Sequence, residues 1–219
     1  MRRRLVAVPL AAFALVLPDA HAASVKLVVS DPKGDANFSG LHGQSIPVGS
    51  QEALDITAVT FDTTRTVSYK IVKRKRVKVE TPTGIVVTIT TAAPPSTTPT
   101  SSYGLSGTHS ACGLLRMQIY YSPDGPTTYG DLADCGSDGN ATNPDQFSID
   151  FSPKIQGNNL VLAIPFKSLP KQFKVGTFLD KITAYTSTAE FVAAGYQPAD
   201  VNPDAGIDTV TAEKAWKVS

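Results

Sequence analysis

The chain has 219 residues, with 20 Lys and Arg against 19 Asp and Glu. This near-neutral balance argues against a general nucleic-acid binder, because such proteins usually contain a strongly basic domain. A chain of this length can bury a hydrophobic core and fits a single domain.

The N-terminus has the three parts of a secretory signal peptide. Met1–Arg4 is basic, Leu5–Leu17 is an apolar run, and Ala20–Ala22 supplies the small residues that a signal peptidase reads. We therefore predict residues 1–23 as the signal peptide, and we expect the protein to be secreted. The apolar run is shorter than the roughly 20 residues of a membrane span, which argues against an uncleaved anchor. No later segment is long and apolar enough to cross a bilayer.

The remaining residues, 24–219, are interpreted as one domain. Loss of three arginines and one aspartate with the leader leaves 17 basic and 18 acidic residues. The two cysteines, Cys112 and Cys135, are predicted to form a disulfide because an exported protein meets an oxidising compartment. Closing a loop of this size stabilises a fold by about 3 kcal/mol. A reactive Cys112 beside His109 is the alternative.

In chain order, segments of β-forming residues alternate with turns rich in Gly, Pro, Asn and Asp. The predicted strands are Val25–Val29, Asp55–Phe61, a hairpin over 67–79, Ile85–Thr91, Leu114–Tyr121, Phe147–Phe151, Leu160–Phe166, Phe178–Tyr185 and Ala212–Val218. Long loops are expected over 30–52 and 92–102. Helices are limited to single turns, at 167–172 and 190–194. The pattern predicts an all-β fold, an antiparallel β-sandwich or a barrel.

Two of these strands carry further information. Ile85–Thr91 is a nearly continuous run of β-branched residues, which predicts a strand in the centre of a sheet or buried on both faces. In Leu114–Tyr121 the apolar side chains alternate, so that Leu115, Met117 and Ile119 share one face with Tyr121.

Three acidic loops, at 35–40, 138–143 and 200–206, carry oxygen-bearing side chains at alternate positions. Calcium loops use this spacing because a tightly turning backbone points every second side chain inward. Only the first loop has the full pattern, with Asp35, Asn37 and Ser39 followed by a glycine. Ile46 stands where an EF-hand has its bidentate glutamate, so this loop is not an EF-hand.

A calcium site at the first loop therefore needs carboxylates from elsewhere in the chain, and the candidates are Asp31, Asp55 and Asp208. Extracellular modules can function with weak calcium sites. The alternative is that these residues only form turns, because Asp and Asn side chains hydrogen-bond their own backbone.

A basic segment lies at the turn of the predicted hairpin. It consists of Lys70, Lys73, Arg74, Lys75, Arg76 and Lys78. Lysines on an exposed strand discourage pairing between sheets, and this interpretation is favoured. The alternative is a projecting ribbon that binds a polyanion, such as a cell-wall polymer, an acidic glycan or an anionic membrane, chiefly through the run from Lys73 to Arg76.

Catalytic motifs are scarce. There is no G-x-S-x-G, H-E-x-x-H or C-x-x-C sequence, and residues 24–219 contain only His42 and His109. A hydrolase with a triad built on His109 stays an alternative, because triads assemble from distant segments. Ser106 and Ser110 are its candidate nucleophiles. For sugar binding, the candidate stacking residues are Tyr103, Tyr129 and Trp216.

Several short motifs together resemble a known superfamily. These are Asp31–Asp35, Asp55 with Ile56 at the start of a strand, Leu160–Leu169 with the sequence LVLAIPFKSL, and the late Asp208. The order resembles that in the family 9 carbohydrate-binding modules, the DOMON domains and the C-terminal domains of glucodextranase-like enzymes. Exported proteins of high-GC Gram-positive bacteria show similar patterns.

The resemblance implies a jelly-roll-like sandwich, and in some members of the group calcium lies near the aspartate-rich loop. The paired tryptophans that clamp sugar in the carbohydrate-binding modules have no counterpart in this chain. Some DOMON domains bind haem through Met and His, but Met117 lies in an alternating strand and is expected in the core. We therefore predict a non-catalytic binding or surface-structural domain, with calcium as the ion and a glycan or cell-wall polymer as the partner.

Overall fold

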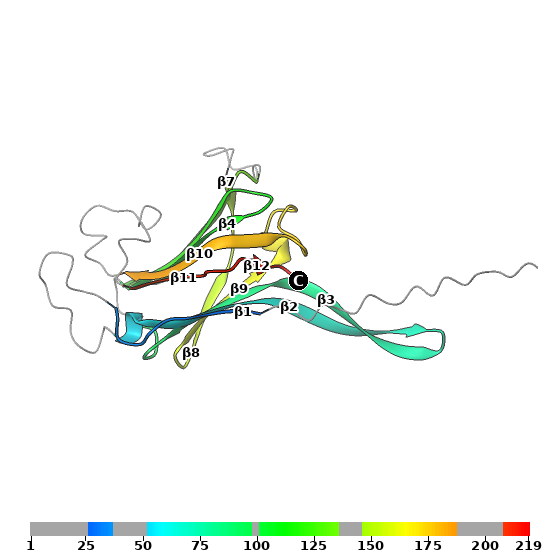
Figure 1. Ribbon diagram of the computed structural model, residues 1–219, viewed down its shortest axis with the longest axis horizontal. Coiled ribbons are helices and arrows are strands. Elements are labelled where there is room, and N and C mark those ends of the chain that lie inside the picture. Colours follow the sequence, from blue (N-terminus) through cyan, green and yellow to red (C-terminus); the bar gives the residue numbers. More distant parts are fainter. Residues whose placement is uncertain (1–25, 37–51, 98–100, 136–145, 188–207) are drawn as a thin grey trace, which may run out of the picture.

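The computed structural model describes residues 26–36, 52–97, 101–135, 146–187 and 208–219. These residues form two antiparallel β-sheets that face one another (Figure 1). The all-β sandwich predicted from the sequence is confirmed. The predicted signal peptide, residues 1–23, lies outside the described residues, and so do His42 and the acidic loops at 138–143 and 200–206.

The first sheet has five strands in the order β1-β2-β3-β9-β8. Their bounds are β1 Leu27–Ser30, β2 Ile56–Val72, β3 Lys75–Thr91, β8 Ser152–Gln156 and β9 Asn159–Pro165. β3 is central in this sheet, as the β-branched run predicted, because it pairs with β2 on one side and β9 on the other. A 3₁₀ turn, η1 (Phe166–Ser168), follows β9.

The second sheet runs in the order β11-β10-β4-β5-β6-β7, and β12 also pairs with β10. Its strands are β4 Ser102–His109, β5 Leu114–Ser122, β6 Gly125–Ala133, β7 Gln146–Ser148, β10 Phe178–Ser187, β11 Asp208–Thr211 and β12 Trp216–Lys217. Of the predicted last strand, Ala212–Val218, only Trp216–Lys217 forms a strand. β4, β6, β8 and β11 have no counterpart among the predicted strands.

The hydrophobic core lies between the sheets and follows the period of two along each strand. Phe61 of β2 and Trp216 of β12 are both at most 1% exposed, and their ring centroids are 5.7 Å apart. In β5, Leu115, Met117 and Ile119 are buried on one face, as the alternation predicted. The core therefore forms where the inward faces of both sheets meet.

The disulfide between Cys112 and Cys135 is present, which confirms the predicted pairing. It joins the β4–β5 turn to the end of β6, and Gly113 N donates to Ala133 O beside it. Among the described residues, no helix has the length and apolar character needed to span a bilayer.

The basic hairpin is longer than predicted, because β2 and β3 are continuous 17-residue strands instead of four shorter segments. The last pair between β3 and β9 is Gly84 with Pro165, and β1 reaches only Phe61. Residues 65–82 therefore extend beyond the rest of the sheet, and we call this two-stranded ribbon the arm (Figure 1).

The core packing predicts a large difference between two phenylalanines. Phe61→Ala removes a ring from the buried contact with Trp216, and we expect it to lower the free energy of unfolding by about 3–5 kcal/mol. Phe178→Ala, at a side chain that is 44% exposed, should cost less than about 1 kcal/mol. Urea unfolding of both variants measures this difference. Equal losses would contradict the assignment of Phe61 to the core.

Candidate metal centre

Three distant parts of the chain meet at the end of the sandwich where β2 begins. Asp31 and Asp35 lie on the turn that follows β1, Asp55 directly precedes β2, and Asp208 opens β11. Asp31 N donates to Thr57 O at 3.0 Å, which holds the turn against β2. Gly34 has a φ of 91°, a conformation that glycine adopts without steric cost, and this folds the turn over β2.

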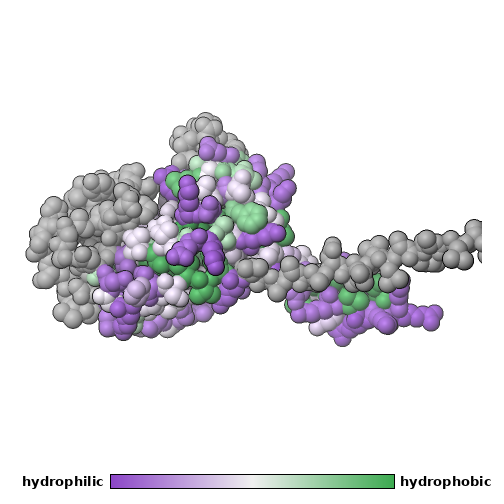
Figure 2. Space-filling model, in the orientation of Figure 1, coloured by the Kyte–Doolittle hydropathy of each residue, from purple (hydrophilic) through white to green (hydrophobic). Residues whose placement is uncertain are grey.

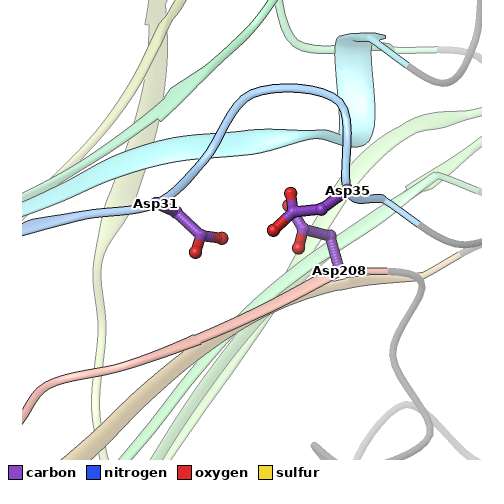
Figure 3. Close-up of side chains that lie close together, drawn as sticks. All are labelled: Asp31, Asp35 and Asp208. Atoms are coloured by element: carbon purple, nitrogen blue, oxygen red, sulfur yellow. The ribbon is translucent and has the colours of Figure 1, made fainter.

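Three of these aspartates form a cluster of carboxylates. One carboxylate oxygen from each of Asp31, Asp35 and Asp208 lies within 4.8 Å of the other two. Figure 3 shows the Asp31 carboxylate facing those of Asp35 and Asp208, which lie together, across the space between the turn and β11. Asp208 is buried, Asp31 is half-buried and Asp35 is exposed. The cluster is thus open to solvent on the Asp35 side.

Asp55 lies beside this cluster and is only 2% exposed. Its Oδ2 accepts a hydrogen bond from Gly34 N at 2.7 Å. Its Oδ1 is buried and has no hydrogen-bond partner among the described residues, and the same is true of Asp31 Oδ2. A buried carboxylate oxygen without a partner is costly, so each of the two has an unmet need for a donor or a cation.

The pKa values of these carboxyl groups reflect burial and mutual repulsion. The pKa of Asp208 is raised to about 7, chiefly by burial and also by the nearby Asp31 and Asp35, against hydrogen bonds from Ile56 N and Thr209 N that lower it. Burial also raises the pKa of Asp31 to about 6, with Asp35 and Asp55 adding to the effect. The Asp55 pKa is raised as well, again chiefly by burial. The ionised cluster is therefore destabilised unless positive charge is supplied.

The protein supplies little positive charge of its own here. Lys33 lowers the pKa of Asp55, but its Nζ lies 3.5 Å from Glu52 Oε1, and both side chains are about 60% exposed. An exposed pair of this kind is strongly screened by solvent. Within the described part of the chain, no Lys or Arg forms an ion pair with the four aspartates.

Of the six metal ligands predicted from the sequence, the structure places four at this end of the sandwich. Asp31, Asp35 and Asp208 form the cluster, and Asp55 adjoins it. The other two, Asn37 and Ser39, lie outside the described residues. Whether the group holds calcium stays a prediction.

The sugar-stacking prediction was wrong for two of its three residues. Tyr103 and Trp216 are each 1% exposed. The Tyr103 hydroxyl donates to Ala53 O at 2.9 Å, and the Trp216 ring packs on Phe61 in the core. Both side chains point from their strands into the core, so neither ring is accessible to a ligand. Tyr129 is half-buried, with the Arg116 guanidinium 6.0 Å from its ring centroid.

His109 is 1% exposed and lies in the interior. Its ring stacks on Phe173 with the centroids 4.3 Å apart, and its Nε2 lies 3.0 Å from Thr177 Oγ1. Burial lowers its pKa, so the neutral imidazole is favoured. Ser110 Oγ accepts a hydrogen bond from Phe178 N. This arrangement gives no support to a triad built on His109.

The outer face of the second sheet carries polar residues that were not selected from the sequence. Arg116 Nε and Nη2 donate to the two carboxylate oxygens of Asp131 at 3.0 and 2.8 Å. Gln118 lies beside Tyr129 across the strands, and its Oε1 is buried without a partner among the described residues. Residues 125–133 were not predicted as a strand, so no sequence pattern placed these side chains on one face with those of β5.

Comparison with family models, with curated proteins and with solved structures finds no match for this chain. The resemblance to the family 9 carbohydrate-binding modules and their relatives therefore stays an expectation. The function must be argued from the geometry of this protein alone.

Proposed function

We propose that this protein is a non-catalytic extracellular binding domain that is stabilised by one calcium ion at the aspartate cluster. The observation that carries the proposal is the convergence of Asp31, Asp35 and Asp208 beside Asp55, with two buried oxygens that no described group satisfies. Carboxylates that are held together and partly buried are stabilised in their ionised form by a cation between them, and without one their pKa values rise.

The donor set favours calcium over other metals. All four side chains offer carboxylate oxygens, and the cluster contains neither His nor Cys. Zinc and copper prefer nitrogen and sulfur ligands, whereas hard cations prefer oxygen. Calcium accepts irregular sets of six to eight oxygens, whereas magnesium demands near-ideal octahedral geometry. The exposed side of the cluster, at Asp35, leaves room for water to complete the coordination.

A calcium ion at this position would act as a clamp. Asp31 and Asp35 belong to the turn after β1 in the first sheet, and Asp208 opens β11 in the second. A shared ion would hold these segments together and offset the repulsion between their carboxylates. Because the unfolded chain lacks the site, binding would stabilise the folded state.

We predict that the Asp35→Asn variant distinguishes a metal site from a turn that is merely acidic. With calcium about a hundredfold above its dissociation constant, the unmodified domain should unfold about 5–10 °C higher than in chelator. Asp35→Asn should lose this rise. In chelator it should be at least as stable as the unmodified protein, because it removes one repelling charge. Thermal unfolding of residues 24–219 under both conditions measures this.

The matched control for that experiment is Asp150→Asn, at an exposed aspartate that follows β7. It should keep the full calcium-dependent rise. Equal midpoints for the unmodified protein with and without calcium would contradict the proposal and leave the aspartates as turn formers.

The partner class that we propose is a glycan or a cell-wall polymer. The outer face of the second sheet supports this choice, because the half-buried Arg116 guanidinium lies 6.0 Å from the ring centroid of the half-buried Tyr129. Sugar sites combine such polar groups with an aromatic face. Tyr185 covers Gly104 on the same face, where a Cβ would meet its ring.

We predict that Tyr129→Ala weakens binding to purified cell-wall polysaccharide by about fivefold or more, because it removes the aromatic face of the site. Retardation in gels that contain the polymer measures the change. Tyr69→Ala, at a 54% exposed ring on the arm, is the matched control and should bind like the unmodified protein. Equal retardation of both variants would argue against this face as the binding surface.

A further inference from the structure

The arm is a two-stranded ribbon that the sandwich does not need for its core. From residue 66 to residue 81 every side chain is exposed except that of Val79, which is half-buried. Within the described part of the chain, the arm strands pair only with each other, and their outer edges are open. Such a ribbon has little intrinsic stability. Its presence therefore calls for a role outside the folded core.

The charge of the arm is of one sign. The segment from Lys70 to Lys78 contains six cations and no acid: Lys70, Lys73, Arg74, Lys75, Arg76 and Lys78. Glu80 is the first acid toward the body, and it pairs with Lys78. Protecting a sheet edge needs only a lysine or two, so edge protection does not account for this density.

The turn at the tip of the arm contains residues that disfavour its backbone conformation. Lys73 and Arg74 form the two-residue turn, with φ values of 48° and 64°. Both angles are left-handed, as in a type I′ turn, for which Asn-Gly is the preferred sequence. Long β-carbon-bearing side chains are disfavoured at both positions. The turn thus gives up backbone stability and places two cations at the extreme tip.

Apolar side chains accompany these cations close to the tip. Ile71 is 83% exposed, Val72 51% and Val77 42%. The register puts Ile71 opposite Arg76 on one face of the ribbon, and Val72 opposite Lys75 on the other. Both faces therefore combine a cation with an apolar group. Figure 2 shows apolar surface beside hydrophilic surface on this projecting part.

We propose that the tip of the arm docks on a lipid bilayer that contains anionic lipids. Ile71 and Val72 enter the interfacial region from the two faces of the ribbon, while the run from Lys73 to Arg76 contacts the phosphate groups. A membrane surface accepts apolar and cationic groups together, and both contribute to binding. This inference does not depend on calcium or on the glycan partner.

Other partners fit these observations less well. A soluble polyanion would engage the cations but leave Ile71 and Val72 in water. A second copy of the arm is disfavoured, because the six cations of one arm would repel the six cations of the other. An end-on approach to a bilayer instead places both faces of the tip in the same medium. The mixed character of both faces therefore favours the membrane.

The charge distribution along β2 supports the same orientation. β2 begins at Ile56, beside Asp55 and Asp208, and ends at Val72, beside the tip. The acidic and basic ends of the domain thus lie at opposite ends of one long strand (Figure 1). Near an anionic surface, this separation steers the domain to approach arm first.

The test is sedimentation of residues 24–219, which contain every described element, with vesicles. One set is phosphatidylcholine alone and the other contains phosphatidylglycerol as well. We expect binding only to the anionic vesicles. Replacing Lys73, Arg74, Lys75 and Arg76 together by Gln should lower the partition coefficient more than about a hundredfold, at about fivefold for each cation. Ile71→Ser should lower it about tenfold.

Two matched variants control for general surface effects. Val175→Ser changes an apolar side chain that is 51% exposed away from the arm, and Lys154→Gln removes an exposed cation on β8. Both should bind like the unmodified protein. Because every substituted side chain is exposed, all variants should unfold at the same midpoint, which shows that losses of binding do not come from misfolding.

A second measurement reports how deeply the tip of the arm enters the bilayer. In Ile71→Trp, emission from the new indole should shift to the blue on anionic vesicles and be quenched by brominated lipid, whereas Trp216 is buried in the core and should not respond. Absence of both signals would overturn the proposal. So would undiminished vesicle binding by Ile71→Ser together with retention on a soluble polyanion, since this would assign the arm to polyanion binding alone.

Discussion

Repulsion between carboxylates dominates the end of the sandwich where the two sheets meet. Asp31 and Asp208 come from different sheets, and burial together with neighbouring charge raises the pKa values of both. The Asp208 carboxylate accepts a hydrogen bond from Ile56 N, which ties β11 to the start of β2. The fold thus brings like charges together at a joint between its layers. A cation at this joint would turn a destabilising contact into a clamp.

The long strands β2 and β3 connect this acidic end to the basic tip of the arm. Their inner halves contribute Phe61 and Ile89 to the core, and their outer halves carry cations and exposed apolar side chains. One hairpin thus changes from core packing to surface chemistry along its length. The two proposed contacts, an ion at one end and a bilayer at the other, leave the outer face of the second sheet for a further partner.

Local pattern predicted some elements of this fold and missed others for physical reasons. The alternation in β5 and the β-branched run in β3 are set by burial, so they are visible in the sequence. β4 was missed because Gly104 has no side chain, and a Cβ there would meet the Tyr185 ring at 2.0 Å; packing dictates that glycine, not strand propensity. Tyr103 and Trp216 were expected at a ligand, but aromatic residues mark cores as readily as sites. The aspartates of the cluster were found because acidic residues in loops are easily recognised in a sequence. Their meeting is a product of topology, as is the hydrogen bond between Ile56 N and Asp208, which joins residues 152 positions apart.

Calorimetric titration of calcium into chelator-treated, desalted protein is the most direct test of the central claim, that the aspartate cluster holds an ion. We expect one calcium ion to bind per chain, with the binding heat abolished in Asp31→Asn and retained in Asp150→Asn. Absence of binding by the unmodified protein, or binding that Asp31→Asn leaves unchanged, would contradict it.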